Sequence, residues 1–426
     1  MKVIFLACLI LFAFRFHLPP QLPDRDFITI GKIGSLAEHH PHNIQFLFIP
    51  HHTHQKIWLS WYAPPPVHLH VGDDWQLHIR IKPTQKNWLL TNNINAIGSV
   101  KFDLKNQLIQ RHHWEFPLEH LRELIYTRLK NTLTPESGLG FISALTIGMR
   151  DYITENQWDD LRGTGTNHLM AIAGLHIGFV SGMGYFLINF LWRRFSALML
   201  WIPAQEAATI GALIFAFLYT GLSGFALPAQ RAVIMLSVFL ITYLYRRKIH
   251  AWSSYFFAMG LILALEPLSI LTPTFWLSFT AVGLLIYGNS GRIGHQGFWR
   301  HATRAQWVMA VGLIPLSFLF FQQVSLTGFI ANCISIPLVG FIILPLCLSG
   351  IFYNFFWTIA GFILMHFWPV MHWLASFPHS QWHQNISNHY SIIISVFTGI
   401  ILLLAPRGFP CRWMGLWGFA PLFLHH

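Results

Sequence analysis

The segment Thr166-Asn-His-Leu-Met-Ala-Ile-Ala-Gly-Leu-His-Ile-Gly178 opens a long apolar stretch that runs to Leu191. Two histidines, His168 and His176, lie inside this stretch, which is apolar enough to enter lipid. Polar side chains at membrane depth are costly, and they usually face a protein interior or a water path. We therefore expect a helix that carries imidazole groups into a bundle, which is the pattern of a conduit or a site rather than of a plain anchor.

Three glycines of the same segment, Gly174, Gly178 and Gly182, recur at every fourth position. Residues with this spacing lie above one another on one face of a helix. A face without side chains allows the backbones of two helices to approach closely in a membrane. The spacing therefore predicts that this face packs tightly against a neighbouring helix.

The composition excludes an ordinary soluble domain. Of the 426 residues, 54% are hydrophobic and only 10% are charged, whereas soluble domains carry about a quarter charged residues. A membrane-spanning helix needs about 20 mostly apolar residues, and we predict an α-helical polytopic membrane protein with roughly ten transmembrane helices. The predicted spans are Val3–Phe16, His168–Leu191, Ala208–Leu222, Ala229–Tyr245, Ser253–Leu271, Phe275–Tyr287, Gln306–Phe321, Leu326–Ile351, Phe355–Phe377 and Tyr390–Ala405.

The positive charge of the chain indicates its orientation. The net charge is +11, and eleven of the 27 Lys and Arg residues fall in alternate loops between the apolar segments, together with one acid, Glu206. Cytoplasmic loops of membrane proteins carry an excess of Lys and Arg. The charge therefore reflects topology rather than a nucleic-acid patch, and it places the N-terminus in the cytoplasm and residues 19–167 outside.

The sequence divides into four predicted regions. Residues 1–18 have a basic start and an apolar core but no small-residue cleavage site, so we predict an uncleaved membrane anchor helix. Residues 19–105 contain short strands separated by Pro, Gly and Asn, which indicate a small exported β-barrel of the OB-fold type. Residues 106–165 are predicted to form amphipathic helices at the membrane interface, and residues 166–426 form the transmembrane domain.

Two patterns assign faces within these regions. The strand Gln76–Lys82 alternates cleanly between apolar and polar residues, so its apolar side chains should share one buried face. The segment Leu118–Leu133 has the period of a helix. Its predicted apolar side consists of Leu121, Leu124, Ile125 and Leu129.

Four tryptophans of the exported region, Trp58, Trp61, Trp75 and Trp88, are candidates for stacking with the bases of a single strand. Aromatic side chains also dominate the energetics of small protein cores. These residues therefore either form stacking platforms, fill the barrel or rest on the membrane surface.

The two histidines of the opening segment allow two interpretations each. His176, as an ionisable group within a predicted span, is a candidate pore-lining or gating residue. It is equally compatible with a packing histidine that bonds to a neighbouring backbone carbonyl. His168 lies at the predicted interface, where an ordinary surface role is the alternative to a place on a polar path.

Arg231 follows Pro228, which suits the first turn of a helix, and it falls near the outer end of the next predicted span. A guanidinium at this place is suited to hold a passing phosphate through two hydrogen bonds. Alternatively, Arg231 snorkels to the outer headgroups or pairs with another group in the bundle.

Asn332 lies with Pro337 and Pro345 in a predicted broken helix between Phe329 and Ser349. Irregular backbone at membrane depth is tolerated only where it is buried in protein or lines a cavity. The segment is therefore a candidate part of a polar path, and a simple proline kink is the alternative.

Signatures of metal binding and catalysis are weak. The histidines of His39-His-Pro-His42 and His51-His-Thr-His54 have no carboxylate at convincing ligand spacing, so we expect no metal. The sequence has no Gly-x-x-x-x-Gly-Lys-Ser/Thr phosphate loop, which leaves ATP coupling within the chain unsupported. No nucleophile and base can be paired, so we expect neither a cofactor nor an enzyme activity.

Several ordered segments resemble the ComEC family of competence proteins. The stretch from His168 to His176 is similar to the most specific motif of that family, and the resemblance extends from about Gly72 to Arg412. The other matching segments are Gly224…Pro228-Ala-Gln-Arg231…Met235, Pro267 with Phe275-Trp-Leu-Ser-Phe279 and Ala281, Asn332…Ile336-Pro337…Pro345, and Gly72-Asp73…Trp75 with Ala96-Ile-Gly98…Val100.

The resemblance implies a channel or permease in the bacterial inner membrane that imports single-stranded transforming DNA during natural competence. It implies that Pro228 and Pro337 take part in helix packing with the three glycines. Expected partners are single-stranded DNA, membrane lipids, a periplasmic DNA receptor, a cytoplasmic motor or DNA-binding protein, and a separate nuclease. The residues expected on the DNA path are His168, His176, Arg231 and Asn332.

Some features depart from the family pattern. Ala173 stands where the family usually has Ser, and Lys82-Pro-Thr-Gln-Lys86 replaces a loop that resembles Asn-Pro-Gly-Phe-Asp. The metallo-β-lactamase-like domain of many members, which is taken to degrade the strand that is not imported, does not follow before His426. The alternatives are therefore a truncated, non-functional or structural membrane remnant of such a channel, and a small-molecule or lipid transporter.

Overall fold

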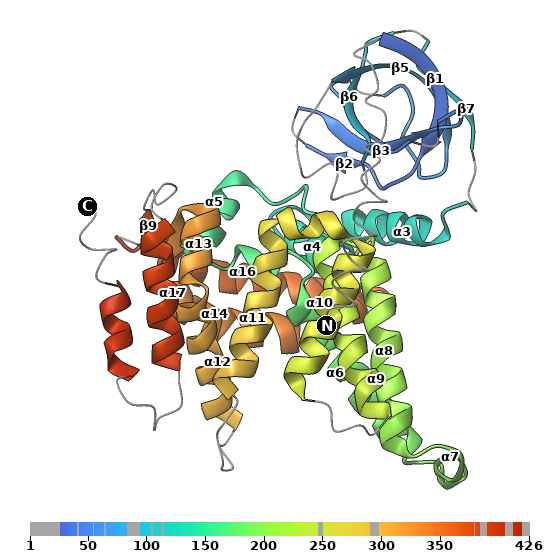
Figure 1. Cartoon of the computed structure of the whole chain (residues 1–426). Helices are drawn as coiled ribbons and strands as arrows, with labels where there is room; N and C mark the ends of the chain where they lie inside the picture. The colour runs from blue at the N-terminus through green and yellow to red at the C-terminus, as the bar shows by residue number, and fades with distance from the viewer. Residues whose placement is uncertain are drawn as a thin grey trace.

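The computed structural model shows a β-barrel above a bundle of helices, with a short helix lying across the junction (Figure 1). The described residues are 26–40, 42–53, 55–63, 65–82, 94–103, 105–111, 115–245, 250–289, 298–378, 380–383, 390–404 and 412–419. The predicted anchor at residues 1–18 and Trp88 lie outside the described residues.

Five strands close the barrel. They are β1 (Asp26–Ile33), β3 (Ile44–Pro50), β4 (Ile57–Trp61), β5 (Asp74–Lys82) and β6 (Ala96–Val100). Their order is β1-β3-β4-β6-β5, and β5 pairs with β1 to complete the ring. All of these pairs are antiparallel except β4 with β6, and the arrangement fits the OB-like barrel that the sequence predicts. The short strands β2 (Glu38–His39) and β7 (Gln107–Gln110) pair with β3 and β5.

Alternation along the strands builds the barrel core. In β5, Leu77, Ile79 and Ile81 are buried, as their spacing predicts. Trp61 and Trp75 belong to the same core, where their rings meet edge to face with centroids 5.8 Å apart. The structure corrects the stacking role predicted for these two tryptophans, because closing the barrel buries their faces and leaves none of Trp75 exposed.

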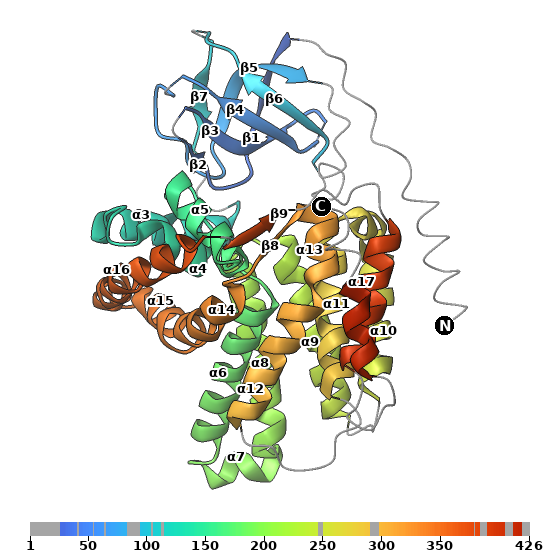
Figure 2. The ribbon, with the colours of Figure 1, turned by 90° about the vertical axis from the view of Figure 1, so that its left-hand side faces the viewer.

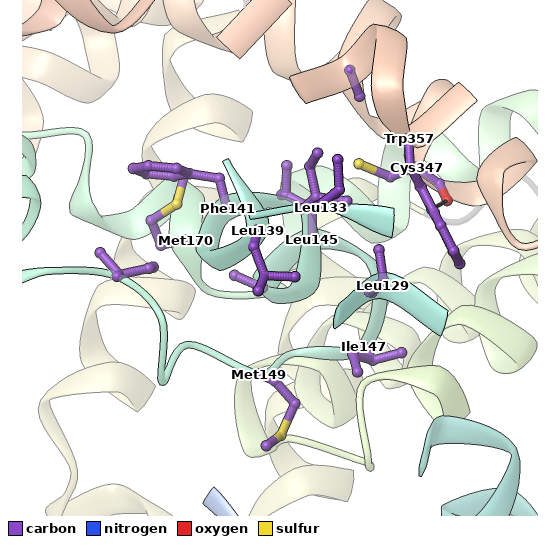
Figure 3. Packing of buried hydrophobic residues seen from close by; sticks show 14 of the residues in the cluster. Leu129, Leu133, Leu139, Phe141, Leu145, Ile147, Met149, Met170, Cys347 and Trp357 are labelled. Carbon is purple, nitrogen blue, oxygen red and sulfur yellow. Dashed lines mark hydrogen bonds between the residues drawn. The ribbon is translucent and has the colours of Figure 1, made fainter. Parts of the chain in front are cut away.

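Three helices connect the barrel to the bundle: α3 (Pro117–Thr132), α4 (Leu139–Ile147) and α5 (Glu155–Gly163). Every residue of α4 is buried, and Figure 3 shows its side chains packed among residues of α3 and of the C-terminal half. Leu36 and Val71 of the barrel belong to the same cluster. The barrel and the bundle therefore share this core at their junction, whereas the interior of the barrel has a separate core of its own.

The amphipathic segment predicted at Leu118–Leu133 corresponds to α3, but only half of its predicted apolar side is buried. Ile125 and Leu129 are buried in the shared core, whereas Leu121 and Leu124 are exposed. The difference arises because the buried face of α3 is formed by Arg122, Ile125, Tyr126 and Leu129, and the two exposed leucines lie beside this face.

The bundle contains several helices that are long and apolar enough to cross a membrane. Within the described residues there are five of them, and the bent pair α12 and α13, with 42° between its halves, makes a sixth candidate. The chain is thus a membrane protein, and the figure of roughly ten spans stays a prediction. The helices of the bundle are α6 (Gly174–Trp192), α7 (Ser196–Trp201), α8 (Ala204–Leu222), α9 (Leu227–Leu244), α10 (Ala251–Leu265), α11 (Pro273–Asn289), α12 (Phe298–Gly312), α13 (Ile314–Phe321), α14 (Gly328–Pro337), α15 (Leu344–Gly350), α16 (Phe355–Ala375) and α17 (Tyr390–Leu404). The five long ones are α6, α8, α9, the run Gly328–Gly350 and α16.

Helix α6 begins six residues later than the sequence predicts. The predicted start at His168 falls in a separate 3₁₀ turn, η1 (Asn167–Met170), and α6 starts only at Gly174. Leu169 and Met170 pack into the core around α4, which holds the turn against α4 and α5 and prevents a single continuous helix. His176 therefore lies in the first turn of α6.

The glycine face predicted for α6 does not pack as expected. A methyl group added to Gly178 or Gly182 would meet nothing within 4 Å, and one added to Gly174 would lie an ordinary 3.5 Å from Cβ of Ala232. The close approach is elsewhere. A methyl group on Gly184 would lie 2.6 Å from Cγ of Phe215 in α8, so α6 and α8 meet through a different face.

The broken helix predicted around Asn332 is irregular but continuous. Helix α14 ends at Pro337, a π-helical segment covers Leu338–Ile343, and α15 follows. Proline has no N–H to donate to the helix, and wider π turns often accommodate such defects. The run Gly328–Gly350 is therefore one candidate span rather than two half-helices.

Candidate functional site

Arg231 is the most unusual buried residue of the bundle. It lies in the second turn of α9, whose N-terminus carries Pro228 as the sequence predicts. Only 2% of Arg231 is exposed, which excludes the predicted alternative that it snorkels outward. Its Nε, Nη1 and Nη2 atoms are buried without a hydrogen-bond partner, although the charge of Glu266 after α10 acts on it.

Burying a guanidinium in this way is costly. A charged group that leaves water needs an opposite charge and hydrogen bonds to offset its desolvation, and the effective penalty is several kcal/mol per ion. The negative charge of Glu266 attracts Arg231, but the five N–H donors of the guanidinium have no acceptor in the described structure. The geometry suits a group that awaits an anionic acceptor such as a phosphate.

His176 is buried at the start of α6. Its side chain is 1% exposed, and Nδ1 accepts the backbone N–H of Ala173 at 3.5 Å. Nε2 is buried without a hydrogen bond of ordinary geometry, although the backbone of Ala171 acts on the ring, as the packing alternative predicts. His168 lies on the exposed turn η1, where its Nδ1 donates to the carbonyl of Gly165 at 3.0 Å. The two imidazoles are close enough for their charges to interact, so the structure brings this predicted pair together.

Asn332 is the third predicted path residue with a buried polar atom that forms no hydrogen bond in the described structure. It lies in α14, and its Oδ1 is buried without a hydrogen-bond partner. Ser335, one turn further along, contacts Sδ of Met371 in α16 at 3.3 Å. Arg231 and Asn332 are thus on separate helices, and neither hydrogen-bonds to the histidine pair.

A cluster of hydroxyl groups beside His168 was missed by the sequence analysis. Thr164 and Thr166 share a hydrogen bond of 2.7 Å, and Ser325 donates to the carbonyl of Gly163 at 2.7 Å. Ser325 ends the short strand β8 (Gln323–Ser325), which lies on the barrel side of the bundle next to β9 (Gln381–His383) (Figure 2). The signal in the sequence was the run Gly163-Thr-Gly-Thr166, which precedes the opening motif directly.

The turn inside this cluster depends on glycine. Gly165 has a φ of +64°, which side chains rarely adopt. A methyl group at this position would also lie 3.0 Å from Cβ of Ser325. The polar rim at the barrel-side end of the bundle is therefore held by backbone geometry as well as by its hydroxyl groups.

Of the three predicted stacking residues that the structure describes, Trp58 is the one that remains partly accessible. Its ring is half-buried on β4, and its Nε1 donates to Oε1 of Gln45 at 3.2 Å. Its neighbour Tyr62, just after β4, is 64% exposed. Among the described barrel residues, these two aromatic side chains are therefore candidates for contact with a base.

Polar contacts fix the barrel on α3. Nδ1 of His70 lies 2.5 Å from Oε1 of Glu123, and the backbone N–H of Val71 donates to Oε2 of the same carboxylate at 3.4 Å. The backbone N–H of His39 donates to Oδ2 of Asp151, which also accepts the hydroxyl of Tyr126. Burial, and then the Asp151 carboxylate, raise the pKa of the Tyr126 hydroxyl well above its ordinary range.

Comparison with known proteins identifies a family and several relatives. The model of the family described as "Competence protein" matches residues 145–408. The chain is 28% identical to "Competence protein ComA" of Neisseria gonorrhoeae over 80% of this chain and 50% of that protein. It is 28% identical to "Recombination protein 2" of Haemophilus influenzae over 72% of this chain and 40% of that protein.

More distant similarity extends to "ComE operon protein 3" of Bacillus subtilis, which is 26% identical over 59% of this chain and 33% of that protein. The chain spans half or less of the length of these curated relatives. No solved structure matches the chain. The family match covers α6 through α17, and these include the helices that carry His176, Arg231 and Asn332. The chain therefore belongs to the ComEC-type family of competence proteins.

Proposed function

We propose that this protein conducts single-stranded DNA across the bacterial inner membrane during natural competence. The observation that carries the proposal is the buried guanidinium of Arg231, whose donors have no hydrogen-bond partner. A phosphodiester is the anion that a competence protein would meet inside a membrane, and a guanidinium holds a phosphate through two parallel hydrogen bonds. Binding a phosphate there would replace the solvation that Arg231 has lost.

The other polar groups support a path through the same bundle. His176 and Asn332 each hold a buried polar atom without a hydrogen bond of ordinary geometry, and polar groups within membrane helices mark pathways for ions and substrates. The hydroxyl cluster around Thr164 and Ser325 lies on the barrel side of the bundle. We infer that a strand passes from the barrel, over this rim and past His168, into the bundle.

The proposed orientation places the barrel outside the inner membrane and the loops rich in Lys and Arg in the cytoplasm. Helices α6 and α9 then carry His176 and Arg231 near their barrel-side ends. The strand would be received outside by a DNA receptor and drawn inward by a cytoplasmic motor or DNA-binding protein. The acyl chains of the lipids would cover the exposed apolar side chains of the bundle.

Transformation efficiency in cells tests the proposal. The gene is deleted, with no second copy present, and replaced by the wild-type chain or by Arg231→Ala, His176→Ala or Arg193→Ala. Arg193 is exposed at the end of α6, so it is a matched control for loss of an arginine. We expect the deletion to abolish transformation, Arg231→Ala to lower it strongly at normal protein level, and Arg193→Ala to have little effect. Normal transformation in the deletion strain would rule out the role in import.

A further inference from the structure

A pocket on the barrel lies apart from the polar groups of the bundle. Its volume is about 290 Å³, and it is lined by His39 of β2, by Ile44 at the start of β3, and by residues 65–69 of the loop between β4 and β5. The loop contributes Pro65, Pro66, Val67, His68 and Leu69. The walls are therefore apolar rings and aliphatic groups with two imidazoles among them.

The pocket lies where the barrel meets the bundle. Its loop continues into His70 and Val71, which both bond to Glu123 of α3. On the other side of the pocket, the backbone of His39 bonds to Asp151. One edge is thus anchored to α3 and the other to the turn between α4 and α5, so the pocket has a fixed position relative to the bundle.

A cation stands close to this pocket. The charge of Lys130 acts on His39, and Nζ of Lys130 lies 4.6 Å from the ring centroid of Tyr126 and 5.4 Å from that of Tyr152. Aromatic rings hold an ammonium group in place by their negative faces. The carboxylate of Asp151 accepts the backbone N–H of His39 and the hydroxyl of Tyr126 through Oδ2, which ties the Tyr126 ring under Lys130 to the His39 wall of the pocket.

The lining has the chemistry of a base-binding site. Unstacked bases are bound by flat side chains, among them His, and every base has a π-face that tolerates such contacts. Partial burial and then the charge of Lys130 lower the pKa of the His39 imidazole. At neutral pH this ring is therefore uncharged and suited to packing against a base rather than to pairing with a phosphate.

We propose that this pocket holds one nucleobase of a single strand that passes from the barrel to the bundle, with the adjoining phosphate beside Lys130. The proposal rests on the proposed function and adds to it the place and the kind of contact. It also gives a place for a base on a barrel whose Trp61 and Trp75 are buried in the core and cannot stack with one.

Oligonucleotide binding to the full chain in lipid nanodiscs tests this proposal. Val67→Trp fills the pocket from an exposed position, and Ile109→Trp adds the same side chain at an exposed position of β7, which does not line the pocket. His68→Ala removes part of the wall and serves as a second pocket variant. Affinity is measured by fluorescence anisotropy for labelled oligo(dT) and for an abasic strand of the same length, with thermal unfolding as a check of the fold.

Loss of one stacked base weakens binding by about 5- to 100-fold. We expect this loss for oligo(dT) with Val67→Trp, a smaller loss with His68→Ala and none with Ile109→Trp, while the abasic strand binds all four proteins alike. Unchanged oligo(dT) binding by Val67→Trp would overturn the proposal that this pocket binds a base. An equal loss for both strands would overturn it too, because it would show that the tryptophan blocks the sugar-phosphate backbone of the strand. If the wild-type chain binds neither strand, the proposed function itself fails, whatever the variants do.

Discussion

The guanidinium of Arg122 lies directly against Gly224. From α3, Nε of Arg122 donates to the carbonyl of Leu222 at 3.0 Å, and Nη2 donates to the carbonyl of Ile147 at 2.9 Å. These carbonyls belong to the last residues of α8 and α4, whose C-terminal ends attract positive charge. Arg122 therefore joins three helices at the junction, and it has room to do so because residue 224 has no side chain.

Gly224→Ala is expected to lower the stability of the protein. Gly224 has a φ of +67°, and an added methyl group would lie 2.7 Å from Cζ of Arg122. Strained backbone of this kind costs roughly 1–3 kcal/mol, and displacement of Arg122 adds to it. Thermal unfolding in detergent measures the loss. Gly178→Ala is the matched control, because its methyl group meets nothing within 4 Å. Equal midpoints for the two variants would contradict the role assigned to Gly224.

Ala173→Ser is expected to stabilise the start of α6. Ala173 is the N-cap of α6 with extended backbone, φ −119° and ψ −179°, and it offers no side-chain acceptor to the first turn. A serine hydroxyl at an N-cap accepts a backbone N–H and contributes about 1 kcal/mol. Hydrogen exchange of the amides of Leu175 and His176, the second and third residues of α6, gives the readout. The same change at Ala171, which is two residues before the N-cap, should not slow their exchange.

The sequence predicted the elements of the fold more accurately than their contacts. Alternation in β5 placed Leu77 and Ile79 correctly, because one face of each barrel strand must be buried. The period of Gly174, Gly178 and Gly182 identified a helix face but not its neighbour. The close contact is made by Gly184 with Phe215 instead, and that choice depends on how α8 lies in three dimensions.

The candidate site was predicted in part, for a similar reason. Arg231 and His176 stood out because polar groups are rare in apolar segments, and the structure buries both. The start of α6 was misplaced because Leu169 and Met170 are as apolar as the helix itself, so hydropathy does not show that they turn into a different core. The contacts of Asp151 with His39 and Tyr126 join distant segments, and no local pattern indicates them.

Glu38→Gln is expected to change how stability depends on pH. Burial raises the pKa of the Glu38 carboxyl above 4.5, with His40 opposing the shift and Asp151 adding to it. A carboxyl whose pKa is raised by folding contributes stability that is complete below the pKa of the unfolded chain and is lost as pH rises through the pKa of the folded state.

The neutral amide of the Gln variant does not titrate, so its stability should fall less as the pH is raised from about 4 to about 8. Thermal unfolding across this range measures the difference between variant and wild type. Glu136→Gln removes an exposed carboxyl from the loop between α3 and α4, and its curve should stay parallel to that of the wild type. A Glu38→Gln curve that is also parallel would show that folding does not shift this carboxyl.

Arg231→Met is expected to raise stability while it lowers DNA uptake. The methionine side chain fills a similar space without the desolvation penalty of a buried cation whose donors are unsatisfied. We expect a gain of roughly 1 kcal/mol or more in thermal unfolding, together with a strong loss of transformation in cells. A trade of stability for function is typical of residues kept for a site.

The exposed Arg193 provides the comparison for this last experiment, since Arg193→Met removes the same charge without removing a buried cation. Neither stability nor transformation should change much in that variant. Arg231→Lys keeps the charge but loses the planar pair of donors, so its transformation should fall between those of the wild type and Arg231→Met. If Arg231→Met instead destabilises the protein, the guanidinium is satisfied within the native fold, and the observation that carries the proposed DNA path is removed.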